Sequence, residues 1–176
     1  TTWGGHDWDA TTAFRYLVRK SIRLYGQFPW YDPYVGGGYS AWGFIDSDTT
    51  IVSPWFFLYL FGDLRLGLRI EVVGMALLNA WGTWLLAGRF TRSIAARAFV
   101  CVLFVVNGRW ALQAASGHAW HLYYAYMSFA LYFFDRSLEG GKSATDFRWR
   151  AAFVSGAFMA LMIYAGAIYP LPHTVF

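Results

Sequence analysis

Long apolar blocks alternate with short arginine-bearing connections along the second half of the chain. A helix needs roughly 20 consecutive, mainly apolar residues to cross the hydrocarbon core of a bilayer. The third block is shorter than that and depends on its aromatic residues. We therefore expect an all-α, polytopic transmembrane helical protein, with a spanning region over residues 66–176. The spans are predicted at about residues 70–88, 98–115, 120–134 and 151–168.

The first part of the chain, residues 1–65, holds no apolar block of spanning length, so we expect it to form a loop outside the hydrocarbon. Apolar residues recur at helical spacing from Phe14 to Tyr25, which predicts a juxtamembrane amphipathic helix lying flat on a membrane surface and ended by Gly26. The opposite face is expected to carry most of the basic residues, Arg15, Arg19, Lys20 and Arg23. The run 54–61 is too short to cross and predicts a re-entrant or interfacial segment.

The composition agrees with a membrane protein. Hydrophobic residues make up 57% of the chain and charged residues 14%, whereas soluble domains carry about a quarter charged residues. The net charge of +4 comes mainly from arginines between the apolar blocks, where they orient helices and meet lipid headgroups. We therefore expect membrane lipids, and not nucleic acid, as partners of these arginines. Cys101 is the only cysteine, which excludes an intrachain disulfide.

The distribution of basic residues predicts the orientation of the helices. Lysine and arginine are absent from the turn at 116–119 and from the segment after Tyr169. The connections after the first and third spans are basic, with Arg89, Arg92, Arg97, Arg136, Lys142, Arg148 and Arg150. Basic connections face the cytoplasm. We therefore expect residues 1–65 and the His118 turn on the extracytoplasmic face of a bacterial inner membrane, and any chemistry with them.

Neither end of the sequence resembles a natural terminus. The chain begins without methionine or a signal sequence, and it stops at Phe176 directly after a proline turn. We therefore expect it to be truncated at both ends, with hydrophobic segments missing upstream and downstream.

Two carboxylates, Asp7 and Asp9, stand immediately before the predicted amphipathic helix. At a membrane surface such a pair can share a divalent cation such as Mg²⁺ or Mn²⁺, or divide into a base and a ligand. The alternative is structural, because Asp9 can cap the helix while Asp7 is solvated.

A second acidic candidate is Asp32, which precedes Pro33 and so either starts a turn or contacts a ligand. The glycines at 36–38 could bring backbone amides to a phosphate, or could simply form a turn.

Further candidates lie near the outer ends of the spans. His118 and His121 are three residues apart and share one helix face, where they can bind a metal, donate to an anionic headgroup, or only hydrogen-bond at the interface. Arg109 and Glu71 are intramembrane ionisable residues, which are functional candidates by default. Glu71 can also pair locally with Arg69.

The order of these features resembles the C-type glycosyltransferases (GT-C fold), membrane enzymes that use lipid-phosphate-linked sugars, and most closely the YfhO-like bacterial branch. Tyr31 stands where the family's loop pattern has tryptophan, and the second half matches mainly in helix spacing. The matching features are Gly5-His-Asp-Trp-Asp9, the basic amphipathic helix, the run Gln27-Phe-Pro-Trp-Tyr-Asp-Pro-Tyr34 with its following glycines, Pro54, and Gly117-His118.

The resemblance implies transfer of a sugar from a polyprenyl-phosphate donor to an extracytoplasmic acceptor. It implies a catalytic carboxylate at Asp7 or Asp9, without separating them, and a divalent metal that some relatives use and others do not. Residues expected to bind substrate are Asp32, Arg109, His118 and His121.

Two other classes of function remain open. A non-catalytic membrane subunit would use the same aromatic and basic residues to pack against partner helices. A transporter of lipid-linked sugars would need a continuous polar path. The intramembrane residues available to line such a path are Glu71, Asn79, Asn107, Arg109 and Gln113.

Overall fold

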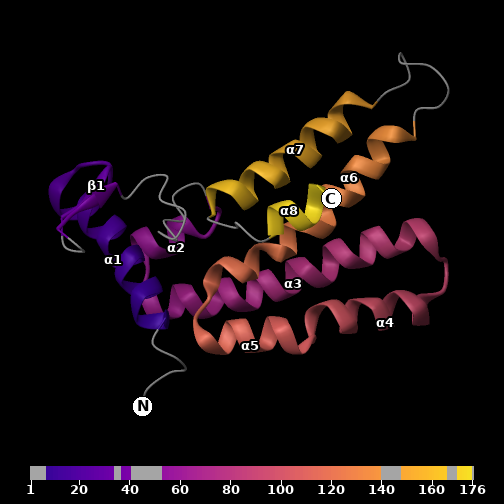
Figure 1. Cartoon of the computed structure of the whole chain (residues 1–176), viewed down its shortest axis with the longest axis horizontal. Helices are drawn as coiled ribbons and strands as arrows, with labels where there is room; N and C mark the ends of the chain where they lie inside the picture. Colours follow the sequence, from indigo (N-terminus) through magenta and orange to yellow (C-terminus); the bar gives the residue numbers. More distant parts are fainter. Residues whose placement is uncertain (1–6, 34–36, 41–52, 140–147, 166–169, 176) are drawn as a thin grey trace.

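The computed structural model describes residues 7–33, 37–40, 53–139, 148–165 and 170–175, and these are predominantly helical, as predicted (Figure 1). Lys142 and the ends of the chain lie outside the described residues. The elements, in chain order, are α1 Asp7–Tyr25, β1 Tyr31–Asp32, β2 Tyr39–Ser40, α2 Phe56–Phe61, α3 Leu64–Phe90, α4 Ile94–Val105, α5 Gly108–Ser116, the 3₁₀ helix η1 Ala119–Tyr124, α6 Ala125–Leu138, α7 Trp149–Tyr164 and α8 Pro170–Val175.

Helix α1 begins at Asp7 and so includes the two aspartates that were expected to precede it. It ends at Tyr25 and is followed by Gly26, whose φ of 61° lies in the left-handed region that glycine adopts readily. Its two first-turn aspartates favour this start because the amide end of a helix carries partial positive charge. The prediction that Arg15 lies on the exposed polar face is wrong. Arg15 is buried, together with Thr11, Leu17 and Val18, in the face that packs on the protein.

A small hairpin follows α1, where the sequence predicted only an ordered loop. Strands β1 and β2 are antiparallel, with Tyr31 opposite Ser40 and Asp32 opposite Tyr39. Gly37 and Gly38 have φ angles of 83° and 104°, which a hairpin turn requires and side chains disfavour.

Among the residues that the structure describes, two helical stretches are long and apolar enough to cross a membrane: the 27-residue α3 and the 23-residue stretch Ile94–Ser116. They coincide with the first two predicted apolar blocks, and their passage through a bilayer stays a prediction. The second is not one continuous helix, however, because Asn107 interrupts it. The Asn107 side chain accepts from Trp110 N at 2.7 Å and so caps α5, while its own Nδ2 donates to Phe104 O at 2.6 Å. This local bonding replaces the backbone pairing of a continuous helix.

The third and fourth predicted spans are also helical but shorter, with 14 residues in α6 and 16 in α7. Helix α6 lies between α3 and α7 (Figure 1). Gly82 of α3 permits close approach, because a Cβ there would meet Phe129 of α6 at 2.9 Å. Ser155 of α7 donates to Ala130 O of α6 at 2.8 Å. Small residues at both contacts therefore bring the helices together.

The two basic connections lie at one end of the helices, as the sequence predicted. Arg89 at the end of α3 bonds Asp135 of α6 at 2.6 Å and also pairs with Glu139. Arg148, just before α7, reaches the same Glu139 at 2.9 Å. Helix α1 lies at the opposite end, beside the start of α3 (Figure 1).

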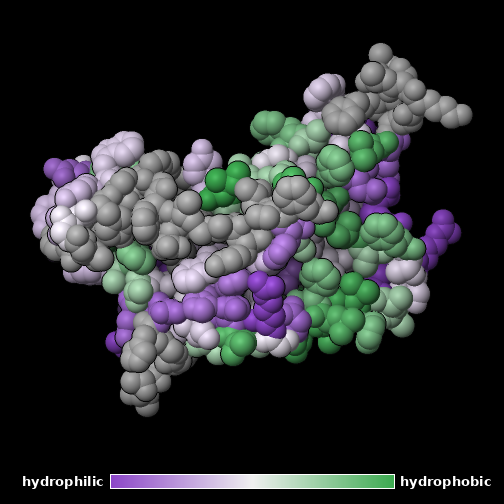
Figure 2. Space-filling view, viewed as in Figure 1, coloured by the Kyte–Doolittle hydropathy of each residue, from purple (hydrophilic) through white to green (hydrophobic). Residues whose placement is uncertain are grey.

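Apolar side chains cover the outer surface of α4. Within α4 no residue is buried, and Phe99, Val102 and Leu103 are all more than half exposed. Figure 2 shows hydrophobic residues gathered where Figure 1 draws α4. Such a surface is stable in contact with lipid chains or other helices rather than with water.

Candidate functional site

The start of α1 lies against the turn between α5 and η1, and this contact joins two motifs that are far apart in the sequence. Asp7 Oδ2 lies 2.6 Å from His118 Nε2. The other ring nitrogen of His118 contacts the side-chain amide of Gln113. The Asp7 side chain remains 50% exposed, so its carboxylate is both oriented by a partner and accessible to a substrate.

Gly117 explains why α1 approaches this turn so closely. Its φ of 87° places it in the left-handed region at the end of α5, and a Cβ there would collide with the backbone of Trp8 and lie 2.8 Å from Asp7 C. Thr11 donates to Gly117 O at 3.2 Å, and the Trp8 indole donates to Ala114 O at 2.9 Å. The Gly117-His118 pair noted in the sequence is therefore the place where the start of α1 packs against the turn.

The structure distinguishes Asp7 from Asp9, which the sequence alone could not do. Asp7 and Asp9 are two residues apart within one helical turn, so their side chains point in different directions. Asp7 meets His118, whereas Asp9 is exposed. The predicted metal site shared by the two carboxylates does not fit this geometry. Among the described residues, no group of three or more His, Cys, Asp or Glu side chains could hold a metal ion.

Beside the Asp7–His118 contact lies a cavity of about 190 Å³, here called the α5 cavity. Arg109 and His121, both expected to bind substrate, line it. The Arg109 guanidinium lies 5.8 Å from the centre of the Tyr124 ring, which stacks on His121. The remaining lining residues are Asn79, Phe104, Asn107, Trp110, Gln113, Met127 and His173.

Gln113 and His121 connect the α5 cavity to the Asp7–His118 contact. Gln113 lines the cavity and touches His118, and the rings of His118 and His121 lie 6.1 Å apart. An arginine, an imidazole and side-chain amides in one small cavity can bind an anionic group such as a phosphate through several hydrogen bonds. The sequence indicated Gln113 only as a residue that could line a transport path, and its connecting position was not predicted.

His173 and Tyr124 add a second missed pair at the same cavity. Tyr124 Oη and His173 Nδ1 are 2.6 Å apart, which brings the start of α6 to α8. No local sequence pattern singled out His173, so its contact with Tyr124 was not predicted.

Asp32 is not brought to this site. It lies in β1, after the C-terminal end of α1, whereas Asp7 begins that 19-residue helix. Its side chain lies outside what the structure describes. Its neighbours Tyr31 and Pro33 line a separate cavity of about 520 Å³ between α1 and the hairpin.

Glu71 belongs to a buried network and not to the α5 cavity. Glu71 forms an ion pair with Arg15 of α1, across 56 residues of sequence. Tyr123 of η1 donates to Glu71 Oε1 at 2.8 Å, and Tyr59 of α2 donates to Oε2. The carboxylate therefore holds α1, α2 and η1 to α3.

No protein-family model matches the chain, and neither a curated protein nor a solved structure matches it.

Proposed function

We propose that this chain is part of a polytopic membrane glycosyltransferase that moves a sugar from a polyprenyl-phosphate donor to an acceptor on the extracytoplasmic face. The observation that carries the proposal is the position of Asp7. Its accessible carboxylate contacts His118, and Gln113 joins His118 to the cavity lined by Arg109 and His121. A carboxylate beside an anion-binding cavity is the arrangement that transfer from a phosphate-linked donor needs.

The orientation of the chain supports the same proposal. The arginine-rich connections at one end would face the cytoplasm. Asp7 and the α5 cavity would then open towards the outer lipid headgroups, where polyprenyl-phosphate sugars are used outside the cell. Membrane lipids and the donor are the partners that this arrangement requires.

In the reaction, Asp7 accepts the proton of the acceptor hydroxyl as its oxygen attacks the anomeric carbon. The bond from that carbon to the phosphate oxygen breaks, and the lipid phosphate leaves with the bonding electrons. Arg109 stabilises the negative charge that develops on the phosphate, and Gln113 holds His118 in place against Asp7. Fixed donors of this kind stabilise the transition state most when water is excluded. No step requires a metal.

The test compares Asp7→Asn with Asp9→Asn in the full-length protein, reconstituted in proteoliposomes with a polyprenyl-phosphate hexose. Asp7→Asn should reduce transfer at least a hundredfold, because general base catalysis contributes about 10²–10⁴ in rate. Asp9→Asn is the matched control and should retain transfer, because Asp9 is exposed, whereas Asp7 is the aspartate that contacts His118. Equal activity of the two variants and the wild type would refute the assignment of Asp7 and favour a non-catalytic subunit.

A transporter of lipid-linked sugars is the second candidate, because Asn79, Asn107, Arg109 and Gln113 all line the α5 cavity. A route across the bilayer would have to continue past Glu71, which is buried and paired with Arg15. Movement of a fluorescent lipid-linked sugar between leaflets of the proteoliposomes, without transfer to an acceptor, would favour transport.

A further inference from the structure

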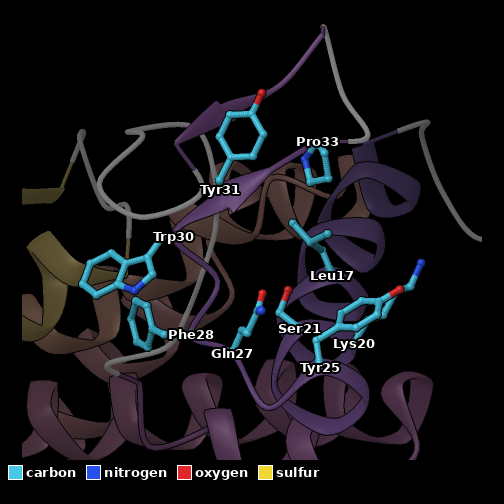
Figure 3. Close-up of a pocket in the computed structure, with 9 residues that line it drawn as sticks. All are labelled: Leu17, Lys20, Ser21, Tyr25, Gln27, Phe28, Trp30, Tyr31 and Pro33. Atoms are coloured by element: carbon cyan, nitrogen blue, oxygen red, sulfur yellow. The ribbon is translucent and has the colours of Figure 1, made fainter.

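A second cavity, the hairpin cavity, lies between α1 and the β1–β2 hairpin, away from Asp7. It has a volume of about 520 Å³, within the range of about 300–1,000 Å³ that is usual for small-molecule sites. Figure 3 shows the residues that line it. They are Leu17, Lys20, Ser21, Tyr25, Gln27, Phe28, Trp30, Tyr31 and Pro33.

Aromatic rings form one wall of the hairpin cavity. The rings of Phe28 and Trp30 have centroids 4.4 Å apart, with their planes inclined at 49° to each other. Trp30 is 64% exposed, an unusual degree of exposure for the largest apolar side chain. Tyr31 stands above them, and its hydroxyl donates to Gly37 O at 3.2 Å. Gly38 leaves room for this ring, since a Cβ there would collide with the Tyr31 hydroxyl.

Polar groups lie between the rings and α1. In Figure 3 the Gln27 amide and the Ser21 hydroxyl both point toward the space between Phe28 and Leu17. Lys20, the residue before Ser21 in α1, also lines the cavity. The cavity thus combines flat aromatic surfaces with hydrogen-bonding groups along a different wall.

We infer that the hairpin cavity binds carbohydrate, through stacking of a pyranose ring on Trp30 and Phe28 and hydrogen bonds from its hydroxyls to Gln27 and Ser21. One face of a pyranose presents C–H groups with partial positive charge, which suits the electron-rich face of an aromatic ring. The ring's edge carries hydroxyls, which both an amide and a serine can bond as donor or acceptor. The volume accommodates a disaccharide.

A lipid chain fits the hairpin cavity less well. Burying an acyl chain there would leave the Gln27 amide and the Ser21 hydroxyl facing hydrocarbon, and burial of a polar group without a hydrogen-bond partner is unfavourable. A sugar satisfies these groups and the rings together.

The experiment measures binding of cellobiose, a disaccharide of two glucopyranose rings, to the full-length protein in nanodiscs by saturation-transfer NMR titration. Trp30→Ala should weaken binding at least tenfold, and Gln27→Ala several-fold. Trp149→Ala is the matched control, because Trp149 is equally prominent on the surface, at 75% exposure, but lies at the start of α7. It should bind as the wild type does.

Absence of saturation transfer to cellobiose would overturn the inference, as would unchanged affinity in both Trp30→Ala and Gln27→Ala. Quenching of Trp30 by brominated lipids in the nanodiscs, measured as the difference between wild type and Trp30→Phe, would overturn it in favour of a lipid site. The inference does not depend on the proposed transfer reaction, because binding is measured without donor. Asp7→Asn should therefore bind cellobiose normally even though it loses transfer.

Discussion

Arg15 of α1 and Glu71 of α3 form an ion pair of 3.0 Å in which both side chains are 1% exposed. Arg15 lies two turns after Asp7, on the face of α1 that also carries Thr11. The ion pair and the Asp7–His118 contact therefore both attach this face of α1 to the rest of the protein. The position of the candidate base therefore depends on a charge pair buried beside it.

Removal of Glu71 should strongly destabilise the protein. In Glu71→Ala, the Arg15 charge stays buried without its carboxylate, which costs about 3–5 kcal/mol for a buried pair. We expect a large fall in the apparent melting temperature of the detergent-solubilised protein, followed by tryptophan fluorescence. Asp135→Ala is the control, because it breaks the partly exposed Arg89–Asp135 pair and should change the transition little. Equal shifts in the two variants would show that burial of the Arg15–Glu71 pair contributes nothing.

Substitution of Gly117 should displace α1. In Gly117→Ala, a left-handed backbone costs about 1–2 kcal/mol and the new methyl group collides with the Trp8 backbone. Gly26→Ala separates the two effects, because Gly26 shares the positive φ but has open space around it. The melting temperature should fall most for Gly117→Ala and less for Gly26→Ala. Gly156→Ala, within α7 and also in open space, should be neutral or stabilising by up to about 1 kcal/mol.

The two ends of the helices should face opposite sides of the membrane. Single cysteines placed at Leu24 of α1 and at Arg92 after α3, in a Cys101→Ser background, test this with a membrane-impermeant maleimide on whole cells. We expect labelling at position 24 in intact cells, and at position 92 only after permeabilisation, because arginine-rich connections are retained in the cytoplasm. Labelling of both from outside would contradict the proposed topology.

Arg109 should control donor affinity rather than proton transfer. Arg109→Ala removes a guanidinium from the α5 cavity and should raise KM for the polyprenyl-phosphate donor at least tenfold, since a charged hydrogen bond to a phosphate contributes about 1.5–3 kcal/mol. Arg92→Ala removes an exposed arginine from the opposite end and should leave KM unchanged. Because Arg109 also stabilises the charge that develops on the leaving phosphate, kcat should fall as well. An unchanged KM would contradict the role of Arg109 in donor binding.

Features that depend on neighbouring residues in the chain could be predicted from the sequence. The apolar blocks predicted the helical stretches of α3 and of Ile94–Ser116, because the length needed to cross a bilayer is a local property. Gly26 marked the end of α1, because a left-handed residue there favours glycine. The arginines marked two connections that the structure places at one end of the helices.

The candidate site could be predicted only as a set of residues and not as an arrangement. The sequence marked Asp7, Arg109, His118 and His121 as candidates because they are polar residues in apolar or aromatic surroundings. Their meeting depends on Gly117 admitting α1 to the turn, a contact across 106 residues between Thr11 and Gly117. A contact between residues so far apart in the chain cannot be predicted from a local sequence pattern.

Tertiary structure decided which of the two aspartates, Asp7 or Asp9, contacts His118, and it decided the burial of Arg15. The sequence pattern placed most of the basic residues of α1, Arg15 among them, on a polar face, yet Arg15 is buried in an ion pair with Glu71. The sequence by itself determined which segments are helical and apolar, since these follow from the solvation of each residue and its near neighbours. Only the packing of α1 against α3 and α5 determined which charges are paired, because the energy of a charge depends on the partner and the burial that distant segments provide.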